Sequence, residues 1–154
     1  MIVQIAKDPP EVEAVRELWR EYWKSMGLPD DFQDFGEELK SLPGVYGADD
    51  GALLIAWIDG TAAGTIALRR FTDRAGEVKR LYLRPQFRGR GLGRHLVEQV
   101  IERARAIGYE TLYADTLPIM TDALALYERM GFETIEPYAS DPTPGAIFLK
   151  LNLT

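Results

Sequence analysis

The sequence predicts an α/β fold in which helices flank a mixed, mostly antiparallel central sheet. Three observations lead to this fold class. Segments that alternate as strands do are interspersed with segments of helical periodicity along the whole chain. Two apolar runs, ALLIAWI and TAAGTIALRRF, are joined by Asp59-Gly60, which predicts a β-hairpin because this turn pair tolerates positive φ. Residues 11–27 and 92–107 gather apolar side chains on one helical face.

The first half of the chain predicts two helices between strands. MIVQIA alternates as a short strand would, and two prolines then precede the helix over residues 11–27. FGEELKSLPG predicts a second short helix that its Pro-Gly pair stops. After the hairpin, GEVKRLYL predicts a third strand of similar length. Its two faces are expected to be formed by Val78, Arg80 and Tyr82 and by Lys79, Leu81 and Leu83.

The second half alternates strands and helices. Pro85 ends the third strand because proline cannot donate to the ladder, and a helix is expected from about Leu92 to Ile107, capped by Gly108. TLYAD predicts a strand and TDALALYERM a helix with Gly131 as its cap. FETIEPY and AIFLKLNL predict closing strands around the turn SDPTPG. The order β-α-α-β-β-β-α-β-α-β-β packs helices on the faces of one sheet.

Composition excludes several function classes. The chain has 154 residues, a length at which we expect one domain over residues 1–154. With no cysteine and a single histidine, neither a metal site nor a Ser-His-Asp triad is expected. The net charge of −6 argues against a nucleic-acid partner. No apolar run approaches the ~20 residues of a membrane span, and MIVQIAKDPPE lacks signal-peptide features, so we expect a cytoplasmic protein.

The stretch RPQFRGRGLGRHLVEQV places glycines and arginines directly before an amphipathic helix. The first turn of a helix carries unpaired N–H groups and a partial positive charge. Glycines let a bulky anion approach the backbone without interference from Cβ atoms. From Val78 to His95 the chain also carries six basic residues and no acidic one. The sequence therefore predicts a cradle for a phosphate or pyrophosphate group.

Two common phosphate-binding motifs do not fit this stretch. A Walker A loop requires Gly-Lys-Ser/Thr, which GRGLGRHL lacks. The dinucleotide fingerprint would need glycine in place of Arg94 or Leu96, although Asp115 lies where a ribose-binding acid would be expected. The turn also follows a run of hairpins instead of opening a βαβ unit. The alternative is a helix N-terminus that binds no ligand, with glycines for packing and arginines for solubility.

The six residues RGRGLG, 88–93, resemble the signature Gln/Arg-x-x-Gly-x-Gly/Ala of the GNAT superfamily of acetyl-CoA-dependent N-acetyltransferases. A second block, ALALYERMGFETI, resembles the C-terminal motif of that family, in which a helix delivers a tyrosine. The predicted element order also matches over nearly the whole chain. The resemblance implies direct transfer of an acetyl group from acetyl-CoA to a small-molecule or peptide amine, without a metal. Because family members often pair, a homodimer is a further expectation.

The resemblance also implies where acetyl-CoA binds. Backbone N–H groups from Arg88 through Arg94 would hold its pyrophosphate. The backbone of Leu81 and Leu83 would pair with the pantetheine arm as an added strand, at an opening where GEVKRLYL and TLYAD splay apart. A backbone N–H near Leu81 would stabilise charge on the thioester oxygen. The implied binding residues are Leu81, Leu83, Arg88, Gly89, Arg90, Gly91, Gly93 and Arg94.

Two catalytic residues follow from the resemblance. The attacking amine must lose a proton and the departing thiolate gains one, so an acid and a base are needed. The phenol of Tyr127 is the acid candidate because it is protonated at neutral pH. Glu77 is the base candidate, acting directly or through a water. Alternatively, Tyr127 is a core residue, and Glu77 forms an ion pair with Lys79 or a neighbouring arginine while a water chain removes the proton.

The chain departs from the family where an asparagine often begins the tyrosine helix, because Met120 stands there. The hydrogen bond of that asparagine is therefore absent or supplied otherwise. Trp19, Tyr22 and Trp23 are interpreted as core residues in preference to an acceptor wall, because aromatics at this helical spacing more often pack. The rival function is a non-catalytic acyl-CoA-binding sensor or regulatory module.

Overall fold

The computed structural model describes residues 1–29, 35–138 and 145–154, and its elements follow the predicted order. The strands are β1 (Ile2–Ile5), β2 (Ala52–Ile58), β3 (Thr61–Thr72), β4 (Ala75–Leu83), β5 (Thr111–Thr116), β6 (Glu133–Ile135) and β7 (Ile147–Asn152). The helices are α1 (Pro9–Ser25), α2 (Phe35–Ser41), α3 (Leu92–Ile107) and α4 (Thr121–Arg129), with 3-10 turns η2 (Gly44–Gly47) and η3 (Pro85–Phe87). All but the last residue of the predicted turn SDPTPG lies outside the described residues.

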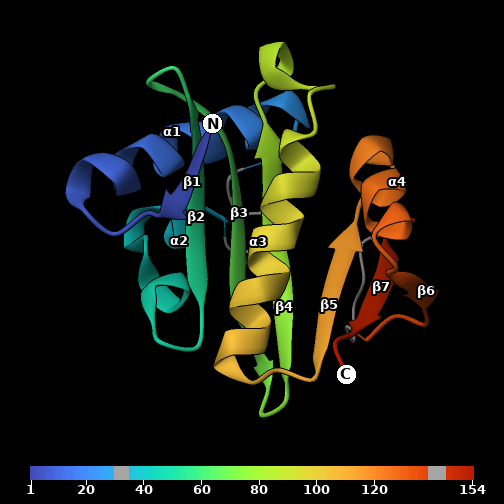
Figure 1. Ribbon diagram of the computed structural model, residues 1–154. Helices are drawn as coiled ribbons and strands as arrows, with labels where there is room; N and C mark the ends of the chain where they lie inside the picture. Colours follow the sequence, from blue (N-terminus) through green and yellow to red (C-terminus); the bar gives the residue numbers. More distant parts are fainter. Residues whose placement is uncertain (30–34, 139–144) are drawn as a thin grey trace.

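The strands form one sheet in the order β1-β2-β3-β4-β5-β7-β6. Neighbouring strands are antiparallel except β4 and β5, which are parallel, so the predicted mixed, mostly antiparallel sheet is confirmed. Figure 1 shows α3 crossing one face of the sheet while α1 and α2 lie on the other. No helix in the described ranges is both long and apolar enough to pass through a membrane.

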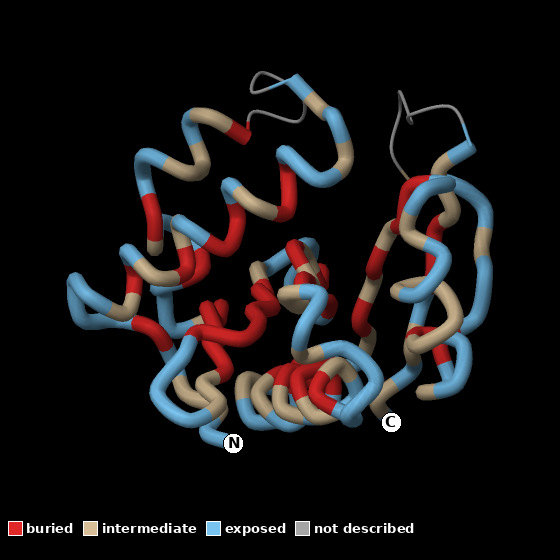
Figure 2. Tube along the Cα trace, turned by 90° about the horizontal axis from the view of Figure 1, so that it is seen from above, coloured by how far each residue is buried: buried red, intermediate tan, exposed pale blue. Residues whose placement is uncertain are grey.

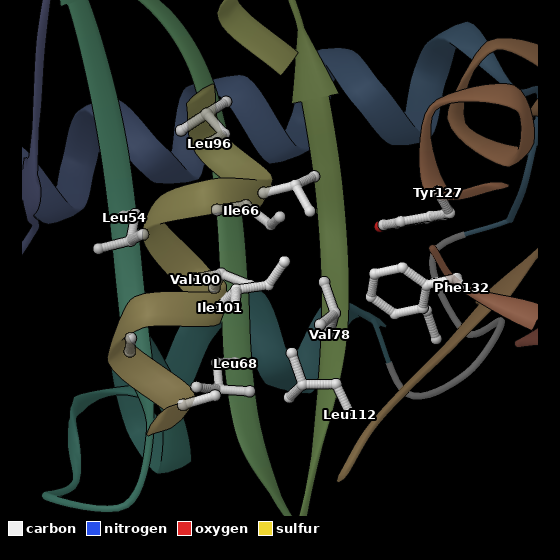
Figure 3. Close-up of a cluster of buried hydrophobic side chains, with 14 of the residues drawn as sticks. Leu54, Ile66, Leu68, Val78, Leu96, Val100, Ile101, Leu112, Tyr127 and Phe132 are labelled. Carbon is white, nitrogen blue, oxygen red and sulfur yellow. The ribbon is translucent and has the colours of Figure 1, made fainter. Parts of the chain in front are cut away.

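Each face of the sheet carries its own apolar core. On one face α3 packs Leu96, Val97 and Val100 against the sheet, and all three side chains are fully buried. On the other face α1 buries Leu18 and Trp19 in a separate cluster. Figure 2 shows buried residues on both faces of the sheet, and Figure 3 shows side chains of the cluster beneath α3. The helical periodicity of both segments therefore predicted the correct buried stripes.

A β-bulge interrupts β4 at Arg80. Ala67 of β3 pairs with Lys79 and Thr65 pairs with Tyr82, so two residues of β4 oppose one residue of β3. Arg80 takes a positive φ of 59°. The extra residue reverses the alternation of side chains, so Val78 joins the core beneath α3 while Arg80 and Tyr82 face α1. The prediction that these three residues share one face was therefore wrong.

The side chain of Arg80 fixes the bulge from the α1 face. Its Nε donates to Glu38 Oε1 of α2 at 3.0 Å, and only 4% of the side chain is exposed. The guanidinium lies 4.8 Å from the ring centroid of Trp23 and 5.6 Å from that of Phe35. These two rings stack on each other with centroids 4.1 Å apart. A buried cation among aromatic rings thus joins α1, α2 and β4.

We expect Arg80→Ala to lower the free energy of unfolding by about 3 kcal/mol, because it leaves the Glu38 carboxylate partly buried without its cation. Urea denaturation followed by far-UV circular dichroism measures the loss. Arg74→Ala is the control, since its ion pair with Glu110 is largely exposed, and it should cost about 0.5 kcal/mol or less. Equal losses in the two variants would contradict the buried role of Arg80.

Candidate acetyl-CoA and amine site

The N-terminus of α3 has backbone N–H groups that precede the first helical hydrogen bond, next to a glycine-rich loop. The first bond within the helix runs from the His95 N–H to the Gly91 carbonyl at 3.1 Å, so the N–H groups of residues 92–94 precede it. Gly89 and Gly91 have φ values of 79° and 81°, which favour glycine. A Cβ at either position would meet nothing within 4 Å. This backbone has room for an approaching anion, and the pyrophosphate cradle itself stays a prediction.

Gly93 has a different role in the same loop. A Cβ at this position would lie 3.1 Å from Leu126 Cδ2 of α4 and 3.5 Å from Leu83 Cδ1. The third glycine therefore lets α3 pack closely against α4 and β4. The alternative interpretation of the glycines as packing residues applies to this one position.

The arginines of this stretch are less available to bind an anion than the sequence indicates. Arg94 Nε donates to Glu98 at 2.9 Å, and Arg84 Nη2 donates to Glu21 of α1 at 2.6 Å. Like Arg80, these side chains are therefore paired with carboxylates. Carboxylates from α1, α2 and α3 thus neutralise part of the positive charge that the unbroken run of basic residues predicted.

Arg88 and Arg90 lie nearest the glycines and contact groups other than carboxylates. Arg88 Nε donates to the Leu83 carbonyl at 3.0 Å, and its guanidinium carbon lies 5.9 Å from the ring centroid of Tyr82. The Arg90 guanidinium carbon lies 5.9 Å from the ring centroid of Phe87. Both side chains are well placed to add charge beside the open backbone.

Strands β4 and β5 separate next to this loop. Their ladder joins Ala75–Val78 to Thr111–Ala114, and β4 continues to Leu83 without β5 as a neighbour. Figure 1 shows the two strands diverging toward the end of the sheet at which α3 begins. A cavity of about 50 Å³ lies at the divergence, lined by residues of α1, β4, β5 and α4, including Leu81. The described residues contain no cluster of three or more acidic or histidine side chains that could hold a metal ion.

Tyr127 of α4 lines this cavity and is almost fully buried. Figure 3 shows its hydroxyl pointing from α4 toward β4. Burial raises the pKa of the Tyr127 phenol well above its ordinary value, and the nearby Tyr22 and Asp115 raise that pKa further. The ring also packs against Phe132 at a centroid distance of 5.0 Å. Tyr127 is thus both a core side chain and a protonated donor at the cavity.

The buried tyrosines make stability sensitive to alkaline pH. Burial raises the pKa of Tyr22, Tyr46 and Tyr127 above the ordinary value of 10.0. Above pH ~10 the unfolded chain loses these protons while the folded chain keeps them, so stability falls as pH rises. We expect a loss approaching about 1.4 kcal/mol per pH unit for each such tyrosine.

Urea denaturation at pH 9, 10 and 11 measures this dependence. Tyr127→Phe provides the control. Because this variant has one buried phenol fewer, its free energy of unfolding should fall less steeply above pH 10, by the contribution of that one tyrosine. Parallel stability curves for the two proteins would show that Tyr127 is not shielded from deprotonation.

Glu77 lies beside the site but does not line the cavity. Its Oε1 accepts from Arg69 Nε at 2.9 Å and from Arg69 Nη2 at 2.8 Å, and its Oε2 accepts from the Tyr138 hydroxyl at 3.0 Å. The side chain is 5% exposed. The ion pair that the sequence left open is therefore present, with Arg69 and not with Lys79 as the partner. The role of Glu77 as a base stays a prediction.

Other residues of the cavity wall were missed or only partly foreseen. Asp115 and Thr116 line it at the end of β5, and sequence analysis gave neither a role in amine transfer. The sequence feature that could have identified them is their position at the end of the strand that runs parallel to GEVKRLYL. Tyr22 and Trp23 line the cavity as well as packing in the core, whereas Trp19 lies in the core and does not line the cavity.

Met120 forms hydrogen bonds at the position where the family often has an asparagine. Its sulfur accepts the Leu117 N–H at 3.3 Å and the Tyr22 hydroxyl at 3.6 Å. The side chain does not cap α4 with a hydrogen bond. The connection between β5 and α4 is therefore tied to α1 through a thioether.

Comparison with known proteins agrees with this geometry. The sequence pattern of the acetyltransferase (GNAT) family matches residues 12–132. An uncharacterized N-acetyltransferase of Schizosaccharomyces pombe is 34% identical over 99% of this chain and 94% of its own length. A GNAT-family acetyltransferase of Staphylococcus aureus superposes with a TM-score of 0.84 at 21% identity, covering 99% of this chain and 100% of that one.

A further solved structure contains the cofactor. A putative acetyltransferase of Salmonella typhimurium with acetyl-CoA has a TM-score of 0.70 at 20% identity, covering 100% of this chain and 94% of that one. The open glycine backbone before α3 and the divergence of β4 from β5 agree with the family match. This chain belongs to the GNAT acetyltransferase family.

Proposed function

We propose that the protein transfers the acetyl group of acetyl-CoA directly to the nitrogen of an amine acceptor. One observation carries this proposal. The cavity between the diverging strands is lined by the protonated Tyr127 of α4, and the same helix packs through Leu126 against Gly93 in the first turn of α3. Helix α4 thus joins the candidate diphosphate site to the candidate site of the reacting group.

The residues present fit acetyl-CoA. The N–H groups of residues 92–94 and the open Gly89 and Gly91 backbone would hold the pyrophosphate. The free edge of β4 beyond Val78 would pair with the pantetheine arm at Leu81 and Leu83. The Leu83 carbonyl is bound by Arg88 Nε, so pairing there would release the Arg88 guanidinium toward the phosphates.

Acetyl-CoA supplies an activated acetyl group: a C–N bond forms, the C–S bond breaks, the nitrogen loses one proton and the sulfur gains one. Tyr127 would donate the proton that sulfur takes, because its phenol holds that proton at neutral pH. The β4 bulge would aim a backbone N–H near Leu81 at the developing negative charge. Glu77 or a water chain would complete removal of the proton from nitrogen.

Free-thiol release from acetyl-CoA in the presence of a panel of amines tests this function. The panel includes small aliphatic amines, amino acids and lysine-bearing peptides. We expect amine-dependent release together with the acetylated amine in mass spectra. Calorimetric binding of acetyl-CoA without release for any member would favour the sensor module, and absence of binding would overturn the proposed site.

A further inference from the structure

Two carboxylates lie on β4 and β5, but they differ in their place along the strands. Glu77 pairs with Tyr113 inside the β4–β5 ladder. Asp115 follows the last pair of that ladder, Val78 with Ala114, and therefore lies where the strands diverge. Only Asp115 lines the cavity.

The contacts of Glu77 occupy both of its oxygens. Arg69 donates two hydrogen bonds to one oxygen and Tyr138 donates to the other. Tyr138 in turn packs edge-on against Tyr113 and Phe148, at centroid distances of 5.2 Å and 4.6 Å. Glu77 thus holds an aromatic wall in place, and an incoming ammonium would have to displace the partly exposed Arg69 guanidinium to reach this buried carboxylate.

The carboxylate of Asp115, in contrast to that of Glu77, is available to bind a cationic ligand. In the part of the chain that the structure describes, no ion pair within 4 Å involves Asp115. Its negative charge raises the pKa of both Tyr22 and Tyr127, which places it between the α1 and α4 sides of the cavity. Of the two cations in the same wall, Arg80 is bound by Glu38, and Lys79 makes no ion pair with Asp115.

A second polar group in the cavity wall has no hydrogen-bond partner among the residues that the structure describes. Thr116 is 1% exposed and lines the cavity, and its Oγ1 forms no hydrogen bond among the described residues. A buried hydroxyl without a partner costs free energy, so its presence at a cavity indicates a polar ligand. Asp115 and Thr116 are adjacent on a strand and therefore point to opposite faces of the sheet.

We propose that Asp115 binds the ammonium group of the acceptor. The Thr116 hydroxyl, on the other face of the strand, then binds a polar group of the acyl donor in the same cavity. This assignment rests on the proposed acetyl transfer and specifies its acceptor as a primary amine that arrives as a cation. A carboxylate and a cation form a charge-assisted hydrogen bond, so the Asp115 carboxylate in the cavity wall suits an ammonium group. The acceptor therefore enters the cavity by its amino end.

Asp115→Asn keeps the shape of the side chain and removes its charge. With an unbranched primary amine from the panel, we expect the KM for the amine to rise roughly ten- to hundredfold, the range for a hydrogen bond to a charged group. The calorimetric affinity for acetyl-CoA and the melting temperature should stay at the parent values.

Glu77→Gln is the matched control on the neighbouring strand. It removes the Arg69 contact and the candidate base, so the melting temperature and kcat are both expected to fall. The KM for the amine should nevertheless stay within about twofold of the parent value at a temperature where the variant is folded. A raised amine KM in Glu77→Gln with an unchanged value in Asp115→Asn would overturn the inference and assign the ammonium site to Glu77.

A binding measurement separates this inference from the proposed function. Titration of n-butylamine into the CoA-saturated protein, followed by NMR shifts of the Asp115 and Thr116 amides, requires no turnover. Saturable shifts that weaken at least about tenfold in Asp115→Asn support the ammonium site even if no amine is acetylated. Equal affinities in the parent and the variant overturn it, even if acetyl transfer is found.

Discussion

We expect Gly91→Asp to abolish detectable binding of acetyl-CoA and to leave the fold intact. Gly91 has a left-handed φ of 81°, which aspartate tolerates better than most side chains, and a Cβ there meets nothing within 4 Å. The new carboxylate would lie where the diphosphate approaches the N-terminus of α3. Bringing like charges together costs about 3 kcal/mol or more, hence at least about a hundredfold in affinity.

Gly108→Asp is the matched control for this experiment. Gly108 follows the other end of α3, also has a left-handed φ, of 107°, and also has open space around its Cβ position. The control therefore carries the same added charge and a similar backbone strain away from the cradle. Calorimetry should give parental affinity for Gly108→Asp and no measurable heat for Gly91→Asp. Parental affinity in Gly91→Asp would remove the pyrophosphate site from this loop.

Tyr127→Phe should lower kcat by about 10²- to 10⁴-fold, the usual contribution of a positioned general acid. The affinity for acetyl-CoA should be nearly unchanged, because phenylalanine fills the same space against Phe132 and only the hydroxyl is lost. Steady-state thiol release gives kcat, and calorimetry gives the affinity. A non-catalytic binding module would tolerate this change without consequence.

Tyr109→Phe provides a control for the general loss of a buried tyrosine hydroxyl. Tyr109 is buried in the same core, and its hydroxyl donates to the Asp50 carbonyl away from the cavity. This variant should lose stability and keep the parental kcat. If Tyr127→Phe and Tyr109→Phe turn over equally fast, Tyr127 does not act as the acid.

Local signals in the sequence were sufficient for most of the fold. The left-handed Gly91 and Gly108 bound α3 at the predicted residues, Leu92 and Ile107. The Asp59-Gly60 turn, with φ values of 49° and 79°, sets the predicted hairpin. The strand predicted over FETIEPY is shorter, since β6 ends at Ile135, before the Pro137 that cannot donate to a ladder.

The site depends more on contacts between distant residues, which local patterns do not contain. The β4 bulge reverses side-chain alternation because Arg80 reaches α1 and α2, and its carboxylate partner is Glu38, on an element far away in the sequence. Likewise, the charge of Arg84 is taken up by Glu21 of α1. Asp115 gains its position only because the parallel ladder stops at Ala114. Each of these features requires the strands and helices to be assembled first.

The buried link from Arg80 to α2 has a consequence for redesign. A graft that exchanges residues 35–41 would also remove Glu38 and Phe35, which hold the β4 guanidinium. A change in α2 therefore also acts on the bulge of β4. A library built on α2 should keep an acid at position 38 and an aromatic ring at position 35, and diversify the remaining solvent-facing positions.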